Sequence, residues 1–571
     1  MALRVPQSAT PQLFKEGYKT LQGLEEAVIR NIHAAKEMSE ITRTSYGPNG
    51  RNKMVINHLE KLFVTNDAAT IIQELDVVHP AAKLLVMASQ QQEDEAGDGT
   101  NYVIILASEL LQKAEDLLRM GLHPSEISVG YELAMKKALK YLETDIHSVK
   151  VDLTNEEDLF RAARTAIASK QYGYEDFLGK LVVEAVKAAM PKNPEHFNVD
   201  NVRVVKILGG SLLQSRVVHG MVFPREPETF LKEAKHAKVA VFTCPVDIGQ
   251  TETKGTVLLH NAKEMLEYTK GEEEQLEKAV LELVDAGINV VVGGSGIGDL
   301  AVHYLNRHNI VAINCPSKFE LRRLCRVIGA NPLARFGAPT AEETGYCDLV
   351  HTEEIGSDRV TVFRQYSTRE AEEKGNNRPA FASRVHKSPV VTLVLRGATQ
   401  NMLDDVERAV DDGVNVTKAL TKDQRLVPGA AATEIELNRH VTREANLTPG
   451  ISQHAMRRYA EAFEVFPRTL ADNAGVNSTE MLAKLFAAHS STDKSAFENP
   501  QAMGIDVDSD RAELKDVTKA NIYDSLAVKQ WAVRYATQAA LTVLQVDQII
   551  MAKRAGGPKL PQQSGNWDDQ D

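Results

Sequence analysis

The sequence has few cysteines, few aromatic residues, no long apolar run and no excess of positive charge. It contains four cysteines and two tryptophans in 571 residues, and aromatic residues make up 6%. No run reaches the roughly 18 apolar residues that a membrane-spanning helix needs, and residues 1–7 lack the apolar core of a signal peptide. The net charge of -12 argues against a nucleic-acid-binding protein, which needs a basic face. We therefore expect neither a membrane nor a nucleic acid as a partner.

The cysteines form no CxxC pair, which argues against a zinc site and against a redox motif. They are Cys244, Cys315, Cys325 and Cys347. Free and mostly buried thiols in a reducing compartment are the simplest interpretation. All four lie in the middle of the chain, which indicates that this region is a separate unit.

The chain is too long for one hydrophobic core, and about two to four domains are expected. Apolar positions recur at helical spacing through most of residues 1–150, and helical patterns dominate again from Gln400 to about residue 550. Between them, buried-type strands alternate with helices, as at 238–244, 288–292 and 310–314. This order predicts an α/β unit inserted between two halves of a helical one.

The stretch Glu95–Asn101 has the pattern of a helix that begins at a bound anion. Glycines at 97 and 99 let the backbone approach a ligand, and the first N–H groups of the following helix are free to bind phosphate. Asp98 would repel phosphate unless a hard cation such as Mg²⁺ lay between them. Taken alone, however, the stretch is better explained as a helix start with an incidental aspartate.

Other turns have the same character. Gly47-Pro48-Asn49-Gly50 follows a helix but is not a Walker loop, Asn66-Asp67 is a typical N-cap, and Val427–Glu434 is a small-residue turn that enters a helix. Each has an ordinary structural explanation, but the three turns at 47–50, 66–67 and 97–99 lie within some 55 residues of one helical region, and such a group is less easily explained in this way. By contrast, Gly293–Gly298 fails the dinucleotide pattern GxGxxG, and neither HExxH nor GxSxG occurs.

A cluster of acidic residues lies on the helix expected after Gly397. Asp405 and Asp412 are a heptad apart and share a face, whereas Asp411 points elsewhere. Most of these carboxylates are expected to form a solvated surface.

Taken together, the motifs resemble those of the group II chaperonins, in particular the subunits of the eukaryotic cytosolic chaperonin called CCT or TRiC. The segments that carry the family resemblance are Thr44–Val55, Thr65–Thr70, Gly97–Thr100 and Val427–Glu434. Those that carry the closer resemblance are Thr65–Thr70, Gly99–Asn101, Ser169–Gly173, His196–Asn201 and Arg408–Asn415. The resemblance covers nearly the whole chain, in order.

The resemblance implies a multidomain α and α/β protein with the chaperonin fold. Its parts would be a helical equatorial domain at 1–150 and 415–554, a hinge-like intermediate domain at 151–213 and 369–414, an inserted α/β apical domain at 214–368 with a helical protrusion near 251–275, and a disordered tail at 555–571. The helix at 299–309 would line the substrate-binding groove.

The resemblance also implies a function, which is ATP-dependent protein folding in the cytoplasm. The cofactors would be ATP or ADP and Mg²⁺. The partners would be related chaperonin subunits in a double ring of eight-membered rings, co-chaperones, and unfolded proteins such as actin and tubulin.

Site residues follow from the same resemblance. Asp98 would hold Mg²⁺, and Asp67 and Asp412 would orient and polarise the attacking water. Contacts to the nucleotide would come from Gly47, Pro48, Gly99, Thr100, Asn101, Ser169, Lys170, Gly429 and Asp524.

Two alternatives remain open at this point. The first is a chaperonin subunit that binds nucleotide, hydrolyses it slowly and acts mainly as a scaffold. This alternative is suggested by departures from the family pattern, which could hinder the fit of the nucleotide. They are at Ala68, Asn101, Ala430, Ala431 and Asn521. The second is a metabolic phosphotransferase with a helical nucleotide domain, which would be a monomer or dimer rather than part of a large particle.

Overall fold

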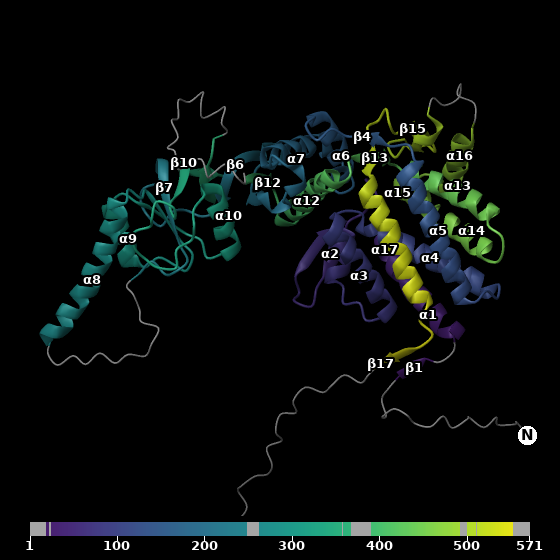
Figure 1. Ribbon diagram of the computed structural model, residues 1–571, viewed down its shortest axis with the longest axis horizontal. Coiled ribbons are helices and arrows are strands. Elements are labelled where there is room, and N and C mark those ends of the chain that lie inside the picture. Colours follow the sequence, from purple (N-terminus) through teal and green to yellow (C-terminus); the bar gives the residue numbers. More distant parts are fainter. Residues whose placement is uncertain are drawn as a thin grey trace, which may run out of the picture.

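The computed structural model describes residues 19–21, 24–247, 262–356, 358–366, 390–491, 499–509 and 511–551. These residues form an elongated molecule with three bodies along its long axis (Figure 1). A helical body at one end contains both the early and the late parts of the chain, and a body of strands and helices at the other end contains its middle.

The helical body is built around α4, which packs against α1, α3, α14 and α17. Nearly every side chain of the first half of α4 is buried, including Val103, Leu106 and Leu110, because an all-apolar helix is stable only when covered on all sides. The helices of this body are α1 (Leu24–Arg43), α2 (Ala68–Glu74), α3 (Pro80–Ala96), α4 (Thr100–Arg119), α5 (Pro124–Thr144), α13 (Ala432–Leu447), α14 (Ser452–Ala462), α15 (Val465–Ala474), α16 (Ser478–Ser490) and α17 (Leu526–Leu544).

Small sheets join the two halves of this body. Near the two ends of the described chain, β1 (Lys19–Leu21) pairs antiparallel with β17 (Ile549–Met551). A three-stranded sheet has the order β16-β13-β4 and combines Tyr523–Ser525, Arg425–Pro428 and Val149–Lys150. The remaining pairs are the hairpin β2 (Lys53–Ile56) with β3 (Leu62–Thr65), and β14 (Met503–Ile505) with β15 (Leu514–Asp516).

The middle body contains α6 (Glu156–Ala168), α7 (Glu175–Ala189) and α12 (Gln400–Lys422). Their buried faces form one core with β5 (Val202–Leu208) and β12 (Val391–Gly397). Helix α12 is continuous through Gly413, where a Cβ atom would lie 3.2 Å from Ile167 and 3.4 Å from Val182. The glycine therefore allows α6 and α7 to pack closely against α12.

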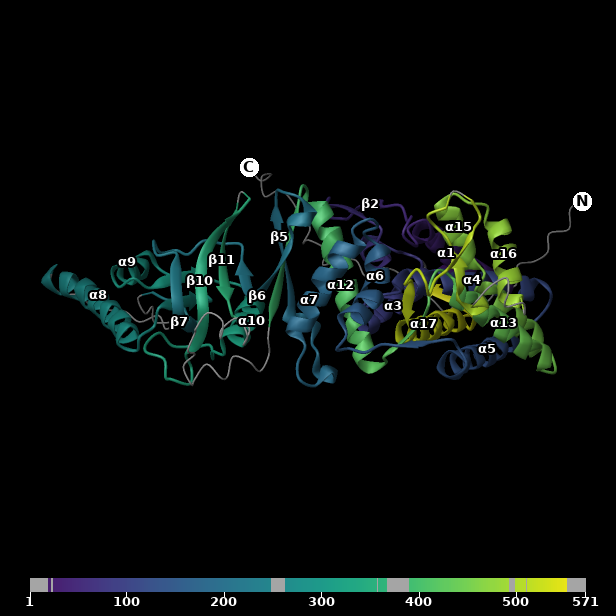
Figure 2. The same cartoon turned by 90° about the horizontal axis from the view of Figure 1, so that it is seen from above.

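An eight-stranded mixed sheet runs from the middle body into the distal body (Figure 2). Its order is β5-β12-β6-β11-β10-β7-β8-β9. The distal strands are β6 (Arg216–Phe223), β7 (Glu233–Phe242), β8 (Val290–Gly293), β9 (Val311–Asn314), β10 (Gly345–Ile355) and β11 (Asp358–Arg364). The distal helices are α8 (Ala262–Asp285), α9 (Asp299–Arg307) and α10 (Lys318–Ile328).

The nested arrangement predicted from the sequence is present: strands and helices alternate in the middle of the chain, and the helical halves come together (Figure 1). The glycine-rich segment 293–298 is a turn between β8 and α9, as expected.

Because β12 pairs with both β5 and β6, the boundary expected at 213/214 falls inside one continuous sheet. The domain boundaries themselves stay predictions.

Two of the expected segments lie wholly or partly outside the described residues. These are the tail at 555–571 and the first part of the protrusion at 251–275, of which residues 262–275 belong to α8.

All four cysteines are described; each is a free thiol, and Cys244 alone among them is not buried. Within the described ranges, no helix combines the length and apolar character required to cross a membrane.

Two helical glycines should respond to alanine in opposite directions. A Cβ atom at Gly130 of α5 would lie 2.4 Å from the Cβ of Ala455 in α14, so Gly130→Ala should destabilise this helix pair by ~1–3 kcal/mol. A Cβ at Gly271 of α8 would meet nothing within 4 Å, so Gly271→Ala should stabilise α8 by up to ~1 kcal/mol.

Hydrogen exchange of peptides from α5, α14 and α8 would measure both effects. Faster exchange in α5 and α14 of the first variant, and slower exchange in α8 of the second, are expected. Unchanged exchange in α5 of Gly130→Ala would show that the two helices do not pack as described.

Candidate functional site

A cavity of about 410 Å³ lies where the helical body meets the middle body. Its walls include most of the residues that the sequence predicted for a nucleotide site: Gly47, Pro48, Asp67, Asp98, Gly99, Thr100, Asn101, Ser169, Lys170, Asp412 and Asp524. The remaining one, Gly429, is not a wall residue but lies beside the wall, because its N–H donates to the carbonyl of Ile522 at 3.1 Å.

Two helices begin at this cavity without a side-chain cap. Helix α4 follows Gly99, whose φ is 80°, and α13 follows Ala431, whose φ is 65°. In both, a left-handed residue precedes the helix and no side chain accepts from the first N–H groups. Free N–H groups and the positive end of the helix dipole make each helix start a place for an anion.

Asp98 lies in the turn before α4. One of its carboxylate oxygens, Oδ1, accepts a hydrogen bond from the N–H of Gly99 at 2.6 Å. Burial raises the pKa of Asp98, and the nearby carboxylate of Asp524 raises it further. A divalent cation at this carboxylate would offset both effects.

The donor set around Asp98 fits a cation that is shared with a phosphate. Among the described residues, no cluster of three or more His, Cys, Asp or Glu side chains has the geometry to hold a metal ion alone. Mg²⁺ is commonly bound through one or two carboxylates together with substrate phosphates, and it needs no complete protein cage.

The ammonium of Lys170 lies between two carboxylates from distant parts of the chain. Its Nζ is 3.1 Å from Oδ1 of Asp67 and 2.6 Å from Oδ2 of Asp412. Lys170 follows the end of α6, Asp67 caps α2, and Asp412 lies within α12. The three side chains are nearly inaccessible, with exposures of 12%, 9% and 5%.

These three groups shift one another's ionisation. Burial alone would lower the pKa of Lys170, but Asp412 and Asp67 outweigh it and raise that pKa above its usual value. Burial raises the pKa of Asp412 well above its usual value, and the ammonium offsets only part of the rise.

Asp67 responds in the opposite direction from Asp412. Its Oδ2 also accepts from the N–H and the hydroxyl of Thr70, at 3.0 and 2.7 Å. Although burial acts to raise the pKa of Asp67, Lys170 and Thr70 lower it to about 2. Asp67 is therefore a fixed anion at neutral pH, whereas Asp412 is the more basic of the two carboxylates.

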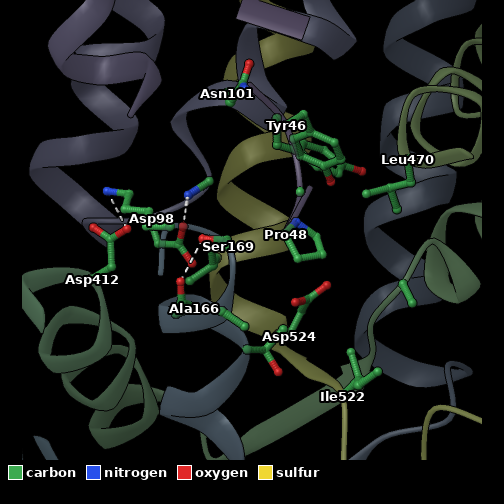
Figure 3. A pocket seen from close by; sticks show the side chains of 18 of the residues that line it. Tyr46, Pro48, Asp98, Asn101, Ala166, Ser169, Asp412, Leu470, Ile522 and Asp524 are labelled. Atoms are coloured by element: carbon green, nitrogen blue, oxygen red, sulfur yellow. Dashed lines mark hydrogen bonds and ion pairs between the residues drawn. The ribbon is translucent and has the colours of Figure 1, made fainter. Parts of the chain in front are cut away.

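Polar and apolar side chains occupy different parts of the cavity. Figure 3 shows Asp98, Asp412 and Ser169 on one side. Tyr46, Leu470 and Ile522 lie on the other side. This separation suits a ligand with a charged end and a flat, less polar end.

The side chains of two predicted site residues form hydrogen bonds within the protein. The side-chain Nδ2 of Asn101 donates to the carbonyl of Thr42 at 3.0 Å, and the hydroxyl of Ser169 donates to the carbonyl of Ala166 at 2.7 Å. The side-chain amide of Asn101 therefore holds α4 to the end of α1.

Three non-glycine residues near the cavity have positive φ. They are Ala430 at 49°, Ala431 at 65° and Asn521 at 55°. All three are among the positions where the sequence is expected, from the family resemblance, to depart from the usual pattern. An alanine in this conformation costs about 1–2 kcal/mol relative to its ordinary backbone regions, so the turn before α13 is strained.

The sequence did not single out every charged residue of the cavity. Glu93 of α3 lines it, and burial together with Asp67 raises the pKa of Glu93 to about 7. Lys529 of α17 also lines it and is buried. The sequence pattern does predict a buried position for Lys529, because this residue lies three residues after Leu526 and four before Val533, on an otherwise apolar helix face.

The model of the TCP-1/cpn60 chaperonin family matches residues 38–554. The chain is 54% identical to the "Probable T-complex protein 1 subunit theta" of Schizosaccharomyces pombe over the full length of both chains. It is 50% identical to "T-complex protein 1 subunit theta" of Saccharomyces cerevisiae, over the full length of both, and 49% identical to that of Homo sapiens, over 100% of this chain and 99% of the human one.

The ion pair of Asp67 predicts a specific dependence of stability on pH. The pKa of Asp67 lies below its unfolded value, so its contribution is present above about pH 4 and is lost as the pH falls toward 2. The contribution at neutral pH is ~2 kcal/mol. Urea titrations at successive pH values should show that Asp67→Asn lacks this part of the acid destabilisation. Equal pH dependence of the wild-type protein and the variant would contradict the ion pair.

Proposed function

The chain belongs to the TCP-1/cpn60 chaperonin family, and we propose that it is an ATP-dependent protein-folding subunit of a hetero-oligomeric double-ring chaperonin. The proposal includes hydrolysis of ATP in the cavity between the helical and middle bodies. It is carried by one observation above all: Lys170 brings Asp67 of the helical body and Asp412 of the middle body together at the cavity wall.

The proposed position of ATP follows from the two sides of the cavity. The phosphates would lie at the start of α4, against the backbone of Gly99, Thr100 and Asn101, with Ser169 and Lys170 on the opposite wall. The adenosine would lie toward the apolar side. Its contacts there would be Gly47, Pro48, Gly429 and Asp524.

Asp98 would hold Mg²⁺ together with the phosphates, and the bound ion would supply neutralisation of phosphate charge. The chain's own carboxylates then have separate roles. Asp412, with its raised pKa, is suited to accept a proton from water, and Asp67, which stays ionised, is suited to orient that water. Phosphate oxygens would also compete for the ammonium of Lys170 and thereby free Asp412.

The proposed assembly joins this chain to related subunits in rings of eight, located in the cytoplasm. Its clients would be unfolded proteins of the actin and tubulin class, and co-chaperones would bind it. Support comes from the relatives' names, each of which designates a subunit of T-complex protein 1. Exposed apolar side chains on the β2–β3 hairpin, with Met54 at 70% and Leu59 at 72%, also suit a surface that contacts another chain.

A second candidate is a subunit of the same ring that binds ATP but hydrolyses it slowly. The specific observation in its favour is the strained turn, where Ala430 and Ala431 have positive φ. Methyl groups at this approach to the cavity would affect the fit of the nucleotide without removing any charged group that binds it.

Replacement of Asp412 in this chain alone separates the two candidates. Loss of a general base typically slows turnover by roughly 10²–10⁴-fold, so Asp412→Ala should slow hydrolysis on this subunit by about that factor while leaving ATP affinity within a few-fold. Complexes carrying the variant would be loaded with 2-azido-ATP and irradiated after a chase. Mass spectrometry would then give the ratio of triphosphate to diphosphate cross-linked to this chain.

The neighbouring Asp411→Ala serves as the matched control, because Asp411 lies on the same helix, does not line the cavity and forms no ion pair with Lys170 among the described residues, although its charge acts on Lys170 from a distance. Its ratio should equal that of the wild-type complex. If the triphosphate-to-diphosphate ratio on Asp412→Ala also equals that of the wild type, the slowly hydrolysing scaffold is favoured. A native mass of one chain in cell extract would contradict both candidates.

A further inference from the structure

A second buried ammonium, that of Lys529, lies at the cavity. The side chain of Lys529 in α17 is 9% exposed. Its Nζ forms an ion pair with the carboxylate of Glu434, the third residue of α13, and lies 2.9 Å from Oδ2 of Asp524 in β16. It also lies 5.0 Å from the centre of the Tyr102 ring.

The two carboxylates beside Lys529 have different surroundings. Glu434 is 1% exposed and is not part of the cavity wall, so it serves as an internal counter-charge. Asp524 is 29% exposed and lines the cavity. An ammonium needs only one carboxylate to be neutralised, and Glu434 already provides it, so the contact with Asp524 has a further consequence for the cavity.

That consequence is the orientation of the Asp524 carboxylate. The β16 backbone is fixed by pairing of Asp524 with Val427 of β13, and Oδ2 is held by Lys529. A Cβ atom on Gly429 would lie 3.4 Å from the same Oδ2, so the turn before α13 closes the space on that side. The described residues form no hydrogen bond to the other oxygen, Oδ1, whereas the close contact of Lys529 is with Oδ2.

Lys529 itself is held firmly. The Tyr102 ring beneath it stacks on Phe466, with ring centres 3.9 Å apart and planes 10° apart. Within the described structure, the hydroxyl of Tyr102 and Oε2 of Glu434 are buried without a hydrogen-bond partner. Lys529 is therefore the principal cation for this polar cluster, and its removal would leave two carboxylates without one.

We propose that Lys529 is a positioning residue for nucleoside recognition: it holds Oδ2 of Asp524 so that Oδ1 accepts hydrogen bonds from the ribose hydroxyls. This inference rests on the proposed ATP site. It assigns to Lys529 a selectivity for ribose over deoxyribose, exerted through Asp524 and without contact between Lys529 and the nucleotide.

The test measures ribose selectivity on this chain within assembled complexes. 2-Azido-ATP is cross-linked in competition with either ATP or 2′,3′-dideoxy-ATP, and mass spectrometry quantifies the label on this chain alone. The wild-type chain should prefer ATP by ~10-fold or more, the usual effect of a hydrogen bond to a charged acceptor. Lys529→Met should reduce this ratio at least about threefold, toward the value of Asp524→Asn.

Two further variants make the result interpretable. Lys529→Met combined with Glu434→Gln removes the buried unpaired carboxylate, so it keeps the test available if the single variant fails to fold. Lys206→Met is the matched control, because Lys206 also lies between two carboxylates, Asp404 and Glu407, each 2.6 Å away, and does not line the cavity. Its ribose selectivity should equal that of the wild type.

The outcomes separate this inference from the proposed function. Unchanged selectivity in a folded Lys529→Met complex, with equal weakening of both nucleotides, would assign Lys529 a purely structural role and overturn the inference. No ribose preference in the wild type would overturn it as well. Absence of any label on the wild-type chain would instead overturn the ATP site itself. The double variant Lys529→Met/Asp524→Asn tests whether Lys529 acts through Asp524. If its preference for ATP is no smaller than that of Asp524→Asn alone, the inference is supported.

Discussion

The ammonium of Lys170 is the contact on which the arrangement of the cavity depends. It lies 3.1 Å from Asp67 and 2.6 Å from Asp412, and so connects α2, the end of α6 and the middle of α12. None of these groups could be buried as an ion without the others, since removal of one partner from a buried ion pair leaves an uncompensated charge. A hydrogen bond from the Asn66 side chain to the carbonyl of Ser169, at 3.3 Å, supports the same junction. The helical and middle bodies are therefore joined through charge as well as through apolar packing.

The balance of charge around the cavity also limits what can enter it. Carboxylates from α2, α3, the turn before α4 and α12 line one wall, and Lys170 is the ammonium among them. They are Asp67, Glu93, Asp98 and Asp412. A bare polyanion would be repelled by this wall, even with two uncapped helix starts directed at it. A polyanion that carries its own divalent cation avoids this conflict, and a metal–nucleotide complex has this property.

Local signals in the sequence predicted most of the helices and strands and several of the turns that border the cavity, whereas the individual site residues followed from the family resemblance. The segments 47–50, 66–67, 97–99 and 427–431 contain Gly, Pro, Asn or Asp, which are typical of turns and helix starts, so these turns could be predicted without knowledge of the fold. The resemblance to a family then brought these turns together, which local patterns alone could not do.

What could not be predicted depends on contacts between distant segments. The sharing of one sheet by β5, β12 and β6 is decided by strand pairing over long sequence separations. The partners of Lys529 come from α13, β16 and α4, so a buried lysine could be inferred from its helix face but not the carboxylates that neutralise it. Similarly, the amide of Asn101 could not be placed on Thr42 before the crossing of α1 and α4 was known.

Helix α12 has a mechanical consequence. Its 23 residues form an uninterrupted rod of ~35 Å, with Asp412 ~18 Å from the end that meets the sheet. Close packing of Gly413 against Ile167 and Val182 fixes the middle of this rod beside α6 and α7. If α12 rotated about that contact, its sheet end would move farther than the carboxylate of Asp412, which lies next to the contact. The rod would then act as a lever between the cavity and the sheet that continues into the distal body.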